Sequence, residues 1–221
     1  MRLNFTLLLV LFSLLSFYAQ DKPLELSHYV FPEFTPGQVL MKNGIKNIVS
    51  LNYNTLSEEM IFEDKGMKLA IADEQLKAID TVFIANRKFV RSEKTFLELV
   101  ASSPPLYIEY KCRIKYPGKV NGPGGRTSQT SSSETYTPTD FRRIIYEVVL
   151  PNGYDTNPYR YYWIEKDGAL KKFKNLNQLA KVYPNKKNLF KAYVKKNDVA
   201  YNNQDSIVKL IAYLERVEKE Q

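Results

Sequence analysis

The sequence has one cysteine, one histidine and one tryptophan among 221 residues. A single cysteine, Cys112, cannot form a disulfide within the chain, so packing must hold the fold together. A single histidine, His28, cannot build a multi-histidine metal site, and the HExxH and paired-cysteine spacings of zinc sites are absent. The sequence also lacks a GxSxG elbow and the Walker and Rossmann glycine patterns. These absences remove the common signatures of hydrolases, metalloenzymes and nucleotide-binding enzymes, and we expect no cofactor.

The first twenty residues have the pattern of a secretory signal peptide. Arg2 precedes an apolar run from Leu7 to Leu15, and a small residue, Ala19, lies just before the charged Asp21. The apolar run is too short for a membrane span, which needs about 20 residues. We therefore expect an exported protein, periplasmic or at the cell surface, with no transmembrane span after cleavage.

The remaining chain predicts a folded protein rich in strands. Hydrophobic residues make up 44% of the sequence, including 16 Tyr and 12 Phe, which is enough for a real core. Three hairpins are expected because alternating or apolar runs flank three short turn sequences, at residues 42–44, 64–66 and 85–87. Residues 72–78 are expected to form a turn or short helix. Two more strands are predicted at 95–101 and 106–116, with the Ser-Ser-Pro-Pro sequence of 102–105 blocking continuous pairing between them.

The pattern changes twice after residue 116. Residues 117–139 are rich in Gly, Pro, Ser and Thr and predict a mobile loop. Residues 141–150 and 159–166 then predict a second hairpin pair. From residue 175 the apolar period becomes helical, and three helix stripes follow, with Asn185 and Asp205 as expected N-caps.

These patterns predict an α+β fold: an antiparallel, meander-rich N-terminal region followed by a small C-terminal helical unit. The expected boundaries are a signal peptide at 1–20, a β-rich domain at 21–174 containing the loop at 117–139, and a helical unit at 175–221.

Two stretches carry a resemblance. The run from Leu51 to Phe62, followed by residues 80–84 and 87–89, resembles exported proteins of Bacteroidota without assigned function. The end of the chain, from Leu179 through Tyr193 to Tyr213, is similar to the helical ends of some of them. The resemblance covers about half of the mature chain. It implies a compartment and brings no chemistry or functional residues.

Lysines are concentrated near the C-terminal helices. Ten lysines and two aspartates lie between Lys166 and Asp198, while the whole chain carries a net charge of +8. Such a cluster favours anionic partners, although lysine lacks the planar fork used to recognise bases, so sequence-specific nucleic-acid binding is not expected. The alternative is that these lysines only cover the solvent faces of amphipathic helices. The candidate anionic-partner surface is Lys181, Lys186, Lys187, Lys191, Lys195 and Lys196.

An aromatic strand provides a second candidate site. Tyr159, Tyr161, Tyr162 and Trp163 could stack on sugar rings while Arg160 and phenol hydroxyls form hydrogen bonds. Alternation places Tyr159, Tyr161 and Trp163 on one face and Arg160, Tyr162 and Ile164 on the other, a pattern that half-buried sheet packing also requires.

The function that these observations favour is a non-catalytic binding protein of the bacterial envelope. Its partner would be an unknown envelope protein or an anionic glycan surface. One alternative is a carbohydrate-binding module that uses the aromatic strand. The other is a carboxylate-dependent hydrolase, since glycoside hydrolysis needs only two suitably placed acids. Its available acids are Glu58, Glu59, Glu109 and Glu147.

Overall fold

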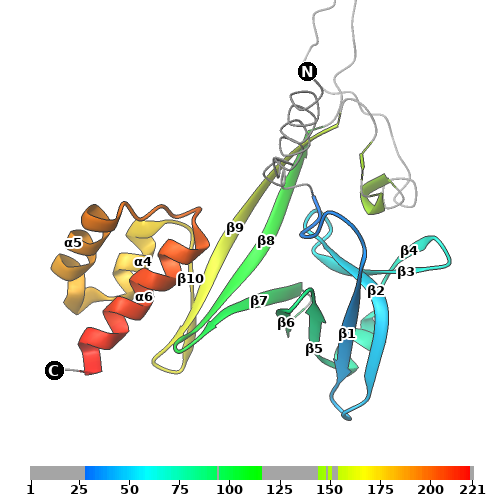
Figure 1. The fold of residues 1–221 in the computed structure, drawn as a ribbon, viewed down its shortest axis with the longest axis horizontal. Coiled ribbons are helices and arrows are strands. Elements are labelled where there is room, and N and C mark those ends of the chain that lie inside the picture. The colour runs from blue at the N-terminus through cyan, green and yellow to red at the C-terminus, as the bar shows by residue number, and fades with distance from the viewer. Residues whose placement is uncertain (1–27, 94, 116–143, 148, 151–153, 220–221) are drawn as a thin grey trace, which may run out of the picture.

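The computed structural model describes residues 28–93, 95–115, 144–147, 149–150 and 154–219. The predicted signal peptide and the predicted loop at 117–139 lie outside these ranges. The described residues form a mostly antiparallel sheet of ten strands with a few helices, mainly near the C-terminus (Figure 1). Because the sheet dominates, the predicted α+β class describes the fold only roughly.

The elements follow one another as strands first and helices last, with one short helix between β4 and β5. Their bounds are β1 (Thr35–Met41), β2 (Lys46–Asn54), β3 (Glu59–Asp64), β4 (Met67–Ala70), α2 (Asp73–Ala78), β5 (Ile79–Ile84), β6 (Arg87–Ser92), β7 (Thr95–Ser102), β8 (Pro105–Lys115), β9 (Asp155–Lys166), β10 (Ala169–Phe173), α4 (Leu176–Val182), a 3-10 turn (Pro184–Lys186), α5 (Lys187–Asn197) and α6 (Gln204–Lys219).

The three predicted hairpins are confirmed as β1–β2, β3–β4 and β5–β6, and residues 73–78 form the expected short helix. At the first turn Gly44 adopts a φ of +87°, a conformation that glycine reaches without steric cost. The prediction that residues 102–105 interrupt pairing was wrong. β7 and β8 pair directly, with Ser102 opposite Pro105, because the chain reverses tightly at the cis Ser103–Pro104 bond.

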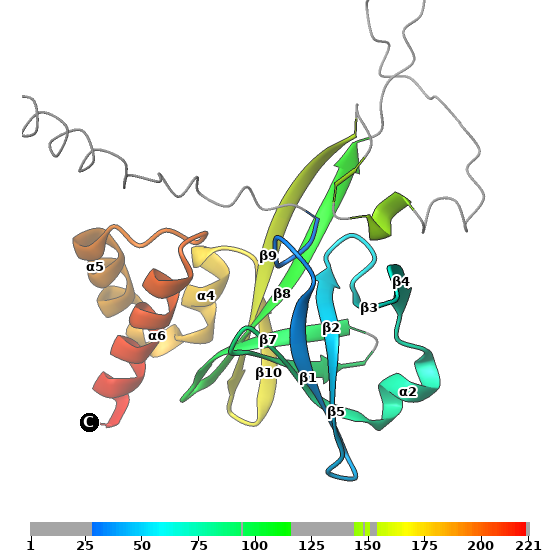
Figure 2. The same ribbon diagram turned by 45° about the vertical axis from the view of Figure 1, so that its right-hand side comes forward.

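The sheet consists of two meanders joined by one pairing. Its strand order is β10-β9-β8-β7-β6-β5-β1-β2-β3-β4, so every neighbour is sequential except β5 and β1. α2 carries the chain from β4, at the edge, back to β5 (Figure 2). β1 therefore pairs antiparallel with both β2 and β5 and joins the two halves of the sheet.

Gly37 lies at this junction, between Val49 of β2 and Ile84 of β5. A Cβ atom at this position would lie 2.8 Å from the backbone oxygen of Phe83 and 3.0 Å from a methyl carbon of Leu51. The backbones of β1 and β5 approach closely there only because residue 37 has no side chain.

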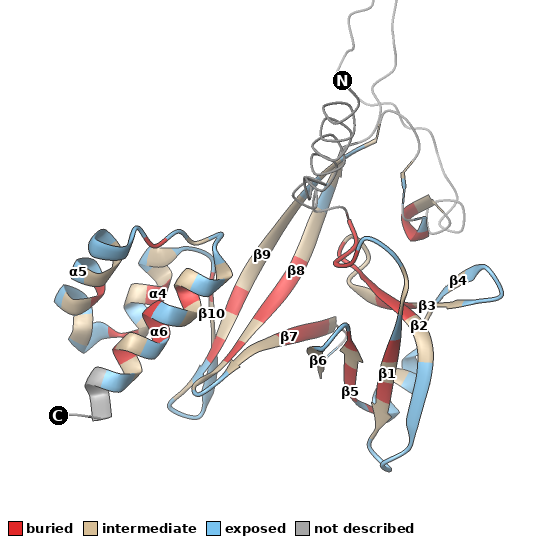
Figure 3. Ribbon diagram, in the orientation of Figure 1, coloured by how far each residue is buried: buried red, intermediate tan, exposed pale blue. Residues whose placement is uncertain are grey.

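One hydrophobic core connects the sheet to the helices. It includes fully buried strand residues such as Tyr53, Phe89 and Tyr162, and helix residues such as Leu179 and Leu210. The apolar stripes that predicted three C-terminal helices supply these contacts. The exposed residues are concentrated at the hairpin tips and on the outer sides of α4, α5 and α6 (Figure 3).

The helix caps differ from the predicted ones. Asn175, and not Asn185, caps a helix: its side chain accepts a hydrogen bond from the Gln178 backbone at the start of α4. Asn203 accepts from the Ser206 backbone at the start of α6, so Asp205 lies in the first turn. Asn185 lies inside the 3-10 turn that precedes α5, and α6 begins one residue before Asp205, so neither predicted cap lies directly before a helix.

Residues 144–146 are helical, which contradicts the predicted strand at 141–150. Ile145 and Tyr146 pack against Tyr29 and Ile61 in a second small cluster, and this packing outweighs the strand propensity of the segment. The second predicted hairpin is therefore wrong as well: β9 pairs with β8 on one side and with β10 on the other.

His28 fixes the 144–147 segment to the first described residues. Its Nε2–H donates to the backbone oxygens of Ile145, at 3.1 Å, and Glu147, at 2.8 Å. Burial lowers the pKa of His28, and the two carbonyl oxygens only partly oppose this effect. The imidazole is therefore a neutral structural donor.

In the described part of the chain, none of the helices combines the length and the apolar character needed to cross a membrane.

The close approach at Gly37 leads to the first prediction. Gly37→Ala should lower the free energy of unfolding by about 2 kcal/mol, since the added methyl group meets backbone that cannot rotate away. Gly66→Asn is the matched control, because Gly66 has open space around it and asparagine tolerates its positive φ. Urea titrations that give equal losses for both variants would contradict the role of Gly37.

The environment of His28 predicts a pH dependence. Because its folded pKa lies below the unfolded value near 6.5, the unfolded state binds more protons, so stability should fall as pH drops through about 6.5. His28→Gln keeps an N–H donor but cannot be protonated, and it should lose this dependence between about pH 7.5 and 5.5. If the free energy of unfolding falls equally with pH in the unaltered protein and in His28→Gln, His28 is not the titrating group.

Candidate functional site

β8 and β9 are the longest strands, with 11 and 12 residues, and together with β10 they form the part of the sheet next to the helical unit (Figure 1). They pair along their length, from Leu106 opposite Ile164 to Lys115 opposite Asp155. Since side chains alternate between the two faces of a strand, this register decides which residues meet.

The aromatic residues of β9 divide between these faces as alternation predicts. Tyr159 and Tyr161 lie in edge-to-face contact, with ring centroids 5.3 Å apart, and Trp163 follows on the same face. Tyr162 lies on the opposite face, where it is fully buried and stacks on Phe173. Tyr162 is therefore a core residue and does not belong with the other three candidates for glycan stacking. Arg160 shares its face, so it is also absent from the aromatic surface.

Basic side chains cover the half-buried rings of this face. The Arg113 guanidinium lies 4.9 Å from the Tyr159 centroid, and the Lys174 ammonium lies 4.7 Å from that of Tyr161. Lys172 lies 4.4 Å from the Tyr161 ring and 4.8 Å from the Trp163 ring. We call this surface the aromatic–cation strip; its members are Arg113, Tyr159, Tyr161, Trp163, Lys172 and Lys174.

One buried carboxylate organises the strip. Glu109 accepts from Trp163 Nε1 at 2.7 Å and forms ion pairs with Lys172 at 2.6 Å and Lys111 at 3.0 Å. Burial alone would raise the pKa of Glu109, but these three donors outweigh it and lower the pKa. Lys111 also bonds Glu58 at 2.6 Å.

This arrangement opposes the hydrolase hypothesis at its best-placed pair of acids. Glu58 and Glu109 approach the same ammonium, but Lys111 lies between them, and Glu109 has a lowered pKa, whereas a general acid needs a raised one. Glu59 accepts from the Tyr146 hydroxyl and Glu147 pairs with Lys68. Within the described ranges, no group of three or more His, Cys, Asp or Glu side chains could hold a metal ion.

The predicted lysine surface lies elsewhere, on the helical unit. Lys187, Lys191 and Lys195 are exposed and lie one turn apart on one side of α5. Lys186 is half-buried, and its ammonium donates to the backbone oxygen of Leu214 at 2.6 Å, so it is an interhelical contact. The remaining two candidates, Lys181 and Lys196, are exposed.

Sequence reasoning did not find the cations of the strip. Arg113 belongs to β8, and its contact with the Tyr159 ring depends on the β8–β9 pairing, which the sequence did not predict. Lys174 directly follows β10, and its contact with the Tyr161 ring depends on the pairing of β10 with β9. The useful signal was that the basic residues of β8, and those in β10 and directly after it, follow the same period of two as the aromatic residues of β9.

Comparison of the chain with family models, curated proteins and solved structures finds no match. The aromatic–cation strip is therefore interpreted from its own chemistry.

Glu109→Gln should destabilise the protein by about 2 kcal/mol, because a neutral amide replaces the charged acceptor of three donors. Trp163, the sole tryptophan, should also shift its emission in the folded state, since its indole N–H loses an ionised partner. Glu165→Gln, an exposed position on the same face, is the control and should change neither quantity. An unchanged midpoint in urea for Glu109→Gln would refute the organising role of this carboxylate.

Proposed function

We propose that the protein is an exported, non-catalytic binding protein of the bacterial envelope that holds an acidic glycan along the aromatic–cation strip. One observation carries the proposal: Arg113 and Lys174 are exposed, lie on tyrosine rings, and form no ion pair with any carboxylate in the described part of the chain. Export is supported by the signal-peptide pattern of residues 1–20, and the single cysteine suits a fold that does not depend on disulfides.

The geometry favours an acidic over a neutral glycan. Stacking of a neutral sugar needs an open ring face, but two ammonium groups lie over Tyr161 and a guanidinium lies over Tyr159. The indole N–H of Trp163, which could bond a sugar hydroxyl, already donates to Glu109. Carboxylate or sulfate groups on a glycan would instead pair with the cations that the rings hold in place.

The charges of the strip also suit a chain with spaced acidic groups. Arg113 and Lys174 each lie within 5 Å of rings whose centroids are 5.3 Å apart, so the two cations are at most about 15 Å apart. Glu109, in the middle of this face, is buried and already paired with Lys172 and Lys111, while the exposed acidic residues of β9 on this face, Asp155 and Glu165, lie at its two ends. Positive charge is thus confined to the middle of the strand, where a short acidic oligosaccharide could bridge the two cations.

The test is a titration of the mature protein with oligogalacturonate, with neutral oligogalactose as the comparison, monitored by calorimetry and by Trp163 fluorescence. Replacing both Arg113 and Lys174 by Gln should weaken oligogalacturonate binding roughly tenfold, about the value of two exposed ion pairs. The control is Lys187→Gln with Lys191→Gln, which removes the same charge from α5 and should leave binding unchanged.

Three outcomes would overturn this function. If neither oligosaccharide binds, the strip is not a glycan site. If both bind equally, the cations have no role in recognition. If the α5 variant loses as much affinity as the strip variant, the attraction belongs to net charge and the lysine surface of the helices becomes the better candidate.

A further inference from the structure

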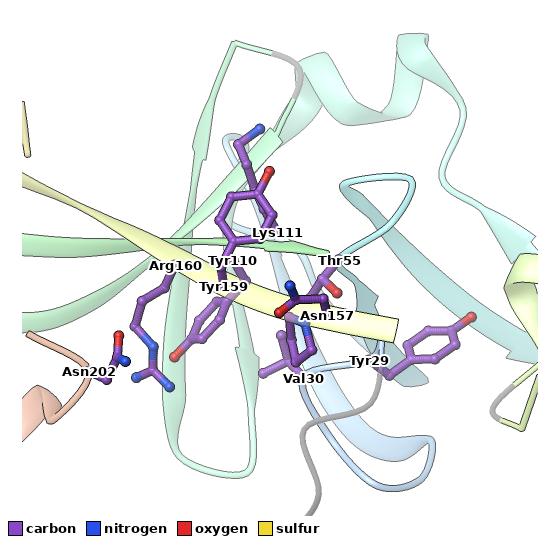
Figure 4. Close-up of a pocket in the computed structure, with 10 residues that line it drawn as sticks. Tyr29, Val30, Thr55, Tyr110, Lys111, Asn157, Tyr159, Arg160 and Asn202 are labelled. Carbon is purple, nitrogen blue, oxygen red and sulfur yellow. The ribbon is translucent and has the colours of Figure 1, made fainter. Parts of the chain in front are cut away.

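A cavity of about 420 Å³ lies where the first described residues, the β8–β9 pair and the loop before α6 meet (Figure 4). Its volume falls within the range of small-molecule sites. Tyr110 and Arg160 project into this region from the sheet face opposite to the aromatic–cation strip. They lie opposite each other in the β8–β9 pair, and Arg160 lies between Tyr159 and Tyr161, whose side chains point to the other face. The lining residues that matter here are Val30, Thr55, Tyr110, Arg160 and Asn202.

The charged residues of the lining are both basic, and one of them lacks a counter-ion. Lys111 is neutralised by Glu58 and Glu109. Arg160 is half-buried and rests 5.8 Å from the Tyr110 ring, but it forms no ion pair with a carboxylate among the described residues. Partial burial of a guanidinium with no anion beside it costs free energy, so the charge of Arg160 is available to an anionic ligand.

The buried acid beside Tyr110 already has its partners. Glu98 accepts two hydrogen bonds from Arg87, both at 2.7 Å, and a third from the Tyr110 hydroxyl at 2.6 Å. The Arg87 guanidinium also packs on the rings of Phe31 and Phe89. Glu98 is thus paired with Arg87 and not with Arg160, whose neighbouring acceptor is the uncharged hydroxyl of Tyr162.

An amide donor completes the lining. The side chain of Asn202 makes no hydrogen bond within the described residues. In Figure 4 the Arg160 side chain extends toward the loop that carries Asn202. The neighbouring Tyr201 fastens this loop to the sheet, since its hydroxyl donates to the backbone oxygens of Arg160, at 3.0 Å, and Phe173, at 3.3 Å.

We propose that this cavity binds a small organic carboxylate. The Arg160 guanidinium would take the carboxylate in its planar fork, the amide of Asn202 would donate to the same group, and the body of the ligand would lie against Val30 and the Tyr110 ring. This site is separate from the glycan strip and does not depend on it. A phosphate group shares part of this chemistry, and the test distinguishes the two.

The probes are succinate, benzoate and inorganic phosphate, each titrated into the mature protein up to about 10 mM. The readouts are the thermal midpoint and the Nε–H NMR signal of Arg160, identified by its absence in Arg160→Gln. We expect a carboxylate to shift both, and Arg160→Gln to weaken its binding at least tenfold. Arg160→Lys, which keeps the charge but loses the fork, should also bind more weakly. Arg113→Gln, on the opposite face, should bind as the unaltered protein does.

Asn202→Asp provides a test that does not depend on removing Arg160. Residue 202 is exposed on a loop, and an aspartate there would supply the missing partner for Arg160. The variant should bind the carboxylate at least tenfold more weakly while its own thermal midpoint rises.

The inference fails if neither carboxylate binds below about 10 mM, or if Arg160→Gln and Asn202→Asp both bind as well as the unaltered protein. Binding of phosphate alone would overturn the assignment to carboxylates. Because the glycan test relies on Arg113 and Lys174, whereas this one relies on Arg160 and Asn202, either proposal can fail without the other.

Discussion

The antiparallel pairing of β1 with β5 is the contact on which the rest of the sheet depends. Every other pairing joins strands that follow one another in the sequence, but only this pairing joins β1–β4 to β5–β10 and lets a single core extend from Tyr53 to the C-terminal helices. Strands joined by such a long-range contact gain little until both are formed, so the junction needs a close backbone fit. Gly37 supplies that fit. The strip lies in the half of the sheet that contains β8 and β9, and the cavity lies where this half meets Val30 and Thr55 of the N-terminal half.

The local parts of this fold could be predicted from the sequence. Turn residues such as Asn43 and Gly44 have a backbone preference that acts within four residues, and the apolar stripe from Ile207 to Leu214 acts within one helix. Alternation along β9 likewise predicted which face each of Tyr159, Tyr161 and Tyr162 occupies. In all these cases the physical cause is close in the chain, so the sequence is sufficient evidence.

The pairing of β8 with β9 could not be predicted in this way, because residues 116–154 separate the two strands. Without that register, nothing in the sequence indicates that Arg113 lies over Tyr159, or that Glu109 accepts from Trp163. The same limit applies to Ile145 and Tyr146, whose β-branched and aromatic neighbours favour a strand until packing against Tyr29 overrides them. For this reason only part of the candidate site could be predicted. The sequence indicated its aromatic rings, but it did not indicate the charged side chains that contact them and determine the chemistry of the site.

The two faces of β9 have consequences for how this protein can vary. Arg160 and Tyr162 alternate with Tyr159 and Tyr161, so one inserted residue in the middle of β9 would turn the following side chains to the opposite face. The aromatic–cation strip would then carry side chains that belong to the core, and the core would receive aromatic rings that belong to the strip. Within β9, evolution is therefore restricted to substitutions, because only they keep each following side chain on its own face of the sheet.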